Sequence, residues 1–86
     1  MHEMSLALEI CRIAEDQVGI DALRRVREVG LVVGRDSGVE PDNLVFCLEA
    51  LLEQPPFAGA KTVMELSPGD VLRVDYLDLE DERPSN

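Results

Sequence analysis

The first three residues of the chain offer a set of nitrogen atoms that could bind a metal ion. Met1 carries a terminal amine, His2 carries an imidazole, and the backbone amides of residues 2 and 3 lie between and just beyond them. An amine, amide nitrogens and an imidazole together form a tetragonal nitrogen site, a geometry that suits Ni(II) or Cu(II). Glu3 would hydrogen-bond the imidazole or tune its charge from outside the ligand set. The alternative is an incidental terminus without a function, because chain ends are usually poorly ordered.

Other arrangements that support chemistry are missing from the sequence. His2 is the only histidine, so no Ser-His or Cys-His dyad can form deep in the fold. The segment GRDSG at residues 34–38 lacks the lysine and the spacing of a phosphate-binding loop. The many carboxylates fit a solvated surface better than a paired catalytic site. We therefore expect a protein that is not an enzyme.

The two cysteines, Cys11 and Cys47, are too few for a disulfide framework. Isolated cysteines in helices usually serve as small buried hydrophobic residues, and a metal or redox role is the alternative. A single bridge between them is a further alternative. The polar, acidic start of the chain does not fit a secretory signal peptide, so we expect a cytoplasmic protein with reduced thiols.

Size and charge limit the partners. The chain has 86 residues and a mass of 9.5 kDa, which predicts one domain over residues 1–80 and a flexible acidic tail at residues 81–86. The formal net charge of −10 repels phosphate backbones, so we expect no nucleic-acid binding and instead a preference for cations or basic partners. No apolar run of about 18 residues exists to span a membrane.

Apolar spacing predicts five elements. A helical stripe of Leu6, Ile10, Ile13 and Val18 indicates a helix over residues 3–18, and a strand follows over residues 25–33. Pro41 is expected to begin a second helix, which ends before the two prolines at positions 55 and 56. Strands are predicted over residues 61–66 and 71–79. In the last strand the apolar phase changes, which indicates a β-bulge near residues 75–76.

The order of these elements predicts an α+β fold with two layers. The succession α-β-α-β-β favours a parallel strand pair with a right-handed crossover, and an antiparallel pairing of the last two strands. Two helices packed on one face of a three-stranded mixed sheet are the simplest arrangement. The opposite face of the sheet is then solvated or available for binding.

Several blocks of the sequence resemble one known family. The opening MHEMSL is followed by GRDSGVEPDNL at residues 34–44, FCLEALL at 46–52, GA at 59–60, GDVLRV at 69–74 and LDLE at 77–80. These blocks are similar, in this order, to the HypA/HybF family of nickel-insertion chaperones. The resemblance covers nearly the whole chain.

The resemblance also has a gap. Members of that family carry a zinc domain with two Cys-x-x-Cys pairs between the second and third strands. This chain has SPGD at residues 67–70 in that place, and neither Cys11 nor Cys47 matches a zinc ligand. We therefore predict no structural zinc. The chain looks like the nickel domain alone.

The resemblance assigns the metal residues one at a time. Met1, His2 and the backbone of Glu3 match the family's nickel site, and Glu40 occupies the place of an acidic residue near the metal. The implied function is carriage of Ni(II) for nickel–iron hydrogenase maturation. Nitrogen ligands lose the metal as they take up protons, so release is expected on mild acidification or by displacement with a partner's thiolates. The implied partners are the nickel-handling GTPase of that pathway and the hydrogenase large subunit. The competing hypothesis is a metal-independent interaction module that docks a maturation factor or hydrogenase subunit.

Overall fold

The computed structural model describes residues 3–80 and confirms the predicted order of elements. A short 3-10 helix, η1, is added between the first helix and the first strand. The predicted tail, residues 81–86, lies outside the described residues. The elements are α1 (Glu3–Val18), η1 (Ile20–Arg25), β1 (Val26–Gly34), α2 (Pro41–Leu52), β2 (Lys61–Ser67) and β3 (Leu72–Leu79).

The strand order is β2-β1-β3, so one predicted pairing is wrong. β1 pairs with β2 in parallel, as expected, but β3 pairs antiparallel with β1 and not with β2. The physical reason is burial. β1 is nearly continuously buried, whereas β2 and β3 have only partly buried and exposed positions. The most apolar strand therefore lies in the middle of the sheet and the other two form its edges.

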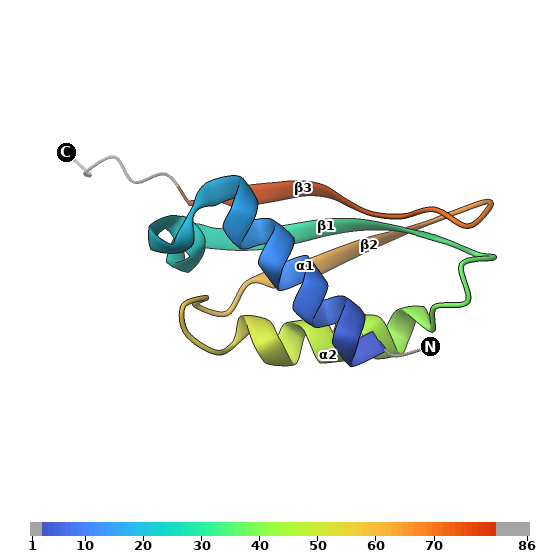
Figure 1. Ribbon diagram of the computed structural model, residues 1–86, viewed down its shortest axis with the longest axis horizontal. Helices are drawn as coiled ribbons and strands as arrows, with labels where there is room; N and C mark the ends of the chain where they lie inside the picture. Colours follow the sequence, from blue (N-terminus) through green and yellow to red (C-terminus); the bar gives the residue numbers. More distant parts are fainter. Residues whose placement is uncertain (1–2, 81–86) are drawn as a thin grey trace.

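Both helices cover one face of the sheet, with α1 crossing it obliquely and α2 beside it (Figure 1). The core forms between this face and the helices. It holds Val29, Leu31 and Val33 of β1, Ala7, Ile10 and Ala14 of α1, and Leu44, Cys47, Leu48 and Leu52 of α2. None of the helices within residues 3–80 is long and apolar enough to cross a membrane.

The predicted bulge in the last strand is confirmed. Gly30 lies opposite Tyr76 and the next residue of β1, Leu31, lies opposite Val74, so Asp75 is the extra residue on β3. The bulge places Val74 and Leu77 on the same face, where both pack against the core. The out-of-phase apolar residues of β3 are thereby accommodated on one side of the sheet.

The connection between β2 and β3 is tied to the end of β1. The backbone N–H of Arg35 donates to Ser67 O at 2.8 Å, and the N–H of Asp36 donates to Gly69 O at 2.8 Å. A third bond runs from Gly34 N–H to Val71 O. Residues 67–71 therefore pass across the end of β1 to reach its other side, which explains how β3 comes to pair there.

The open face of the sheet carries a tyrosine that covers a glycine. The ring of Tyr76 occupies the space that a Cβ on Gly30 would fill, and its hydroxyl donates a hydrogen bond to the Glu28 carboxylate. That hydrogen bond, together with partial burial and the charges of Glu28 and its neighbours, raises the pKa of Tyr76 to about 12. The neutral phenol is thus the stabilised form.

An alkaline titration tests this contact directly. Tyr76 is the only tyrosine and the chain has no tryptophan, so phenolate absorbance reports on one residue. We expect ionisation near pH 12 in the folded protein and at a clearly lower pH, closer to the ordinary value of about 10, after Glu28→Gln. Because the folded pKa is raised, the stabilisation is complete below about pH 10 and is lost as the pH rises towards 12. Glu65→Gln, on the other edge strand, is the matched control, and ionisation of the parent near pH 10 would contradict the contact.

Candidate metal centre

The residue that begins α1 is anchored on the start of α2. One carboxylate oxygen of Glu3 accepts the backbone N–H of Glu40 at 3.0 Å, and the other accepts the side-chain amide of Asn43 at 3.2 Å. Glu3 is 8% exposed and is the buried charged residue of the core region. Glu40 is the N-cap of α2 but makes no capping bond with its own side chain. Glu3 therefore performs a capping function across 37 residues of sequence.

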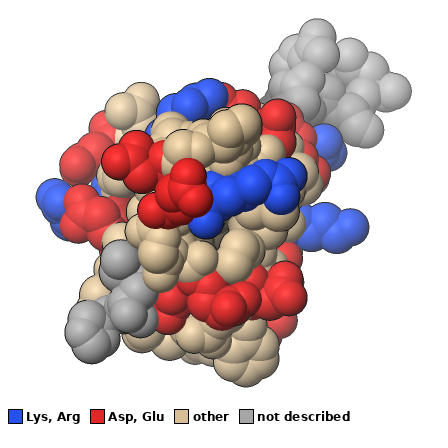
Figure 2. All heavy atoms as spheres, turned by 90° about the vertical axis from the view of Figure 1, so that its right-hand side faces the viewer, with Lys and Arg blue, Asp and Glu red and all other residues tan. Residues whose placement is uncertain are grey.

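This contact brings the N-terminal ends of both helices together. Each helix end carries a partial positive charge from its aligned peptide dipoles, which disfavours a bound cation. Acidic side chains offset this field: Glu3 lies between the two ends, and Glu40 and Asp42 are exposed at the start of α2. Figure 2 looks at the molecule from this end and shows patches of Asp and Glu among other residues, with several Lys and Arg side chains between them. The carboxylates of Glu3, Glu40 and Asp42 are thus the acidic groups at the two helix ends.

Hydrogen bonding lowers the pKa of Glu3. The backbone N–H of Glu40 is the main cause, and the backbone N–H of Glu3 and the amide of Asn43 add to it, against the opposing effect of burial. The carboxylate is therefore ionised at neutral pH and is already held by donors on α2. Its side chain serves to position the start of α1, and its backbone nitrogen is the part that the predicted metal site uses.

Replacing Glu3 by glutamine tests this anchor. We expect Glu3→Gln to lower the melting temperature at pH 7 by about 4–8 °C, as for the loss of a helix cap in a small domain. Because the folded pKa is lowered, the carboxylate stabilises the fold above the unfolded pKa, and this stabilisation is lost as the pH falls through the folded pKa. The difference between parent and variant should therefore shrink below about pH 4. The control is Glu15→Gln, at an exposed position of the same helix, and an equal loss in both variants would contradict the anchor.

Of the four predicted metal residues, two can be placed. Met1 and His2 lie outside the described residues, whereas Glu3 and Glu40 are in direct contact. Within residues 3–80 no group of three or more His, Cys, Asp or Glu side chains is arranged to hold a metal ion. The site at Met1, His2, Glu3 and Glu40 therefore stays a prediction.

Three further residues differ in how well the sequence predicted them. Asn43 was not predicted, because its contact with Glu3 joins residues 40 positions apart and leaves no local pattern. Cys47 is buried in the core and Cys11 is partly buried against it, and both are free thiols, as expected for small hydrophobic residues. Burial raises the pKa of the Cys11 thiol, which makes it a poorer metal ligand at neutral pH.

Comparison with known families decides the relationship. The family model described as hydrogenase/urease nickel incorporation, metallochaperone, hypA matches residues 1–72. The chain belongs to the HypA family. The predicted resemblance is thereby confirmed over α1, β1, α2 and β2, and the match ends at the first residue of β3.

Individual relatives agree with the HypA match. The chain is 39% identical over 69 residues to the hydrogenase maturation factor HypA of Albidiferax ferrireducens, covering 80% of this chain and 61% of the relative. It is 42% identical over 69 residues to that of Geobacter metallireducens, with coverage of 80% and 60%. For Chlorobium limicola the identity is 38% over 65 residues, with coverage of 76% and 56%. The chain thus spans less than two thirds of the length of these HypA relatives.

Proposed function

We propose that this HypA-family chain is a nickel-binding metallochaperone that carries Ni(II) for the maturation of nickel–iron hydrogenase, without a zinc lobe. The main support is the family match, whose description names nickel incorporation and which includes the first residues of the chain. A second support is the anchored start of α1, because Glu3, the residue next to His2, is hydrogen-bonded to α2. The chain has no Cys-x-x-Cys pair, and β2 and β3 are joined by residues 68–71 alone.

The nickel site that we propose is built from nitrogen atoms at the start of the chain. The amine of Met1, the imidazole of His2 and the backbone nitrogens of residues 2 and 3 provide the ligands, in the tetragonal geometry that Ni(II) accepts. Glu40 lies beside Glu3 and supplies a negative charge near the metal. The metal is cargo, so the chain needs no catalytic group to move it.

Protonation provides the release step. Nitrogen ligands must be deprotonated to bind a metal, so acid weakens binding as His2 and the Met1 amine take up protons. Thiolates of an acceptor protein would displace the nitrogen ligands by competing with them for the metal. The proposed acceptors are the nickel-handling GTPase of the maturation pathway and the hydrogenase large subunit, in the cytoplasm. The net charge of −10 favours a basic surface on either acceptor.

The alternative function is a metal-independent interaction module that docks a maturation factor or hydrogenase subunit. The open sheet face favours it, since Val63 and Tyr76 are 43% and 40% exposed there. This module would bind its partner equally well with and without nickel.

Equilibrium dialysis against Ni(II) tests the proposed carriage, using protein with an unblocked Met1 amine. We expect one nickel per chain, with binding weakened as the pH is lowered below about 6.5, the ordinary histidine pKa. Glu40→Gln should weaken binding by up to about tenfold, the lower end of what outer-shell substitutions cost. Glu53→Gln, the same change at the exposed opposite end of α2, is the matched control and should leave affinity unchanged. Absence of nickel binding in the parent would reject carriage and leave the interaction module.

A further inference from the structure

The outer edge of β3 is an exposed edge of the sheet that can pair with a strand of another molecule. β3 is an edge strand, and within residues 3–80 its backbone pairs only with β1. An exposed edge presents unpaired N–H and C=O groups, which are a template for another strand. The other edge of the sheet is different, because Glu49 of α2 accepts the backbone N–H of Thr62 at 2.9 Å and so occupies part of the β2 edge.

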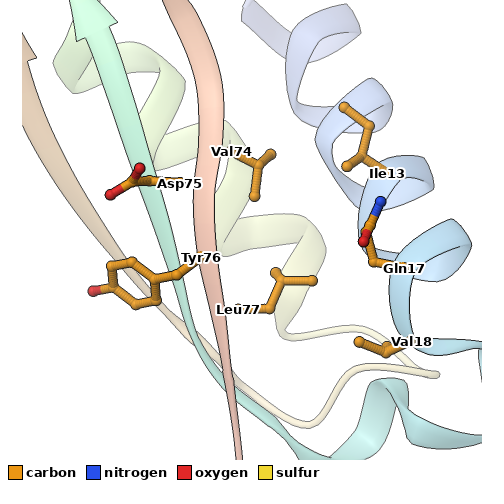
Figure 3. A pocket seen from close by; sticks show the side chains of 7 residues that line it. All are labelled: Ile13, Gln17, Val18, Val74, Asp75, Tyr76 and Leu77. Carbon is orange, nitrogen blue, oxygen red and sulfur yellow. The ribbon is translucent and has the colours of Figure 1, made fainter.

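A groove with apolar side chains on both of its walls follows the same edge on the helix side of the sheet, although polar atoms line it as well. It lies between α1 and β3 and has two adjoining parts that share Ile13 and Val74. The larger part has a volume of about 430 Å³ and is shown in Figure 3, where Val74 and Leu77 point towards α1 while Asp75 and Tyr76 point away from it. A strand placed beside β3 would direct its apolar side chains into this groove.

The sequence of β3 is complementary to itself when two copies run antiparallel. With the two-fold axis between Asp75 and Tyr76, Leu72 faces Leu79 of the second copy and Val74 faces Leu77. These pairs lie on the helix side of the sheet, because their partners on β1 are Val33, Val26, Leu31 and Val29. Apolar side chains therefore meet apolar side chains, over the groove.

The same register pairs opposite charges on the open face. Arg73 faces Asp78 of the second copy, and the two-fold axis repeats this pair. Both side chains are about half exposed, and each already pairs within its own chain: Arg73 with Asp75 at 3.6 Å, and Asp78 with Arg27 at 3.3 Å. Asp78 would then lie between two arginines. The bulge at Asp75 makes this match possible, because without the extra residue Val74 and Leu77 would lie on opposite faces.

We propose that this chain forms a two-fold symmetric homodimer through antiparallel pairing of β3 with β3 of a second copy, joining the two sheets into one of six strands. The interface consists of the strand edge, the apolar groove and two Arg73–Asp78 pairs. The net charge of −10 on each copy opposes association at long range, so the dimer should strengthen as moderate salt screens this repulsion.

Charge exchange across the two-fold axis tests the dimer. Sedimentation velocity of the parent, over about 1 to 500 µM, should show conversion to twice the chain mass of 9.5 kDa. Arg73→Asp and Asp78→Arg each create two like-charged contacts and should raise the dimer dissociation constant at least about tenfold. An equimolar mixture of the two variants restores both pairs in the heterodimer and should dimerise as the parent does.

Two controls test whether the dimer uses the β3 edge and whether the variants fold. Lys61→Asp changes a charge at the β2 edge and should leave the dimer unaffected, whereas a loss of dimer would move the interface to β2 and overturn the proposal. The fold of each variant is checked by circular dichroism, and Arg73→Asp alone suffices if Asp78→Arg does not fold. A monomeric parent at all concentrations, a dimer that tolerates Arg73→Asp, or no association in a mixture of two folded variants would each overturn the proposal.

Discussion

Replacing Gly34 by alanine is expected to lower the free energy of unfolding by about 3 kcal/mol, among the larger effects of a single methyl group. A Cβ at this position would overlap the carbonyl oxygen of Gly69 and lie 2.6 Å from the backbone nitrogen of Val71. Backbone atoms cannot rotate away as a side chain can. The strand end and residues 67–71 would have to separate, which weakens the three backbone hydrogen bonds between them.

Thermal unfolding measures this effect, and the melting temperature should fall by roughly 10–20 °C. Gly30→Ala is the matched control, since it is the same change in the same strand. The three atoms nearest to a Cβ on Gly30 all belong to the ring of Tyr76, which can move, so we expect a loss of about 1 kcal/mol. Equal losses in the two variants would show that residues 67–71 are not closed against the end of β1.

Changes at the first two residues are expected to have the largest effect on nickel binding. His2→Ala removes the imidazole, and one added residue before Met1 moves the terminal amine away from it. Substitutions outside the ligand set typically cost 10–100-fold in metal affinity, so loss of a ligand itself should cost about 100-fold or more. Calorimetric titration with Ni(II) measures both variants against the parent.

These two variants also separate the effect on nickel binding from any effect on folding. Both changes precede Glu3, so the anchor on α2 and the melting temperature should be unchanged. Ser5→Ala, at an exposed position in the first turn of α1, is a control for changes near the site and should bind as the parent does. Parent affinity in both variants would place nickel elsewhere in the chain.

Local sequence patterns predicted most of the fold. The stripe ending before Gly19, the proline at the first position of α2 and the prolines at 55 and 56 gave helices close to Glu3–Val18 and Pro41–Leu52. The change of phase in the last strand correctly indicated the bulge at Asp75. These features depend on neighbouring residues, which is why a single sequence was enough to find them.

Long-range contacts were harder to predict. The succession of elements suggested that β2 and β3 pair with each other, whereas the connection crosses the end of β1 and β3 pairs on its other side. The metal residues were predicted from nitrogen chemistry and from the resemblance and stay a prediction, whereas the contact that joins Glu3 to Glu40 and Asn43 left no signal in the sequence. Such contacts depend on how two helices pack, and the spacing of residues along one helix does not encode this.

X-ray absorption at the nickel edge reports on the ligands of the proposed nickel site, using protein with a free Met1 amine loaded with one equivalent of Ni(II). Binding by the terminal nitrogens should give four-coordinate, planar nickel with only nitrogen or oxygen neighbours and the outer-shell scattering of one imidazole, all lost in His2→Ala. Sulfur scattering from Cys11 or Cys47, six-coordinate nickel without imidazole, or an unchanged spectrum in His2→Ala would contradict a site built from the terminal nitrogens.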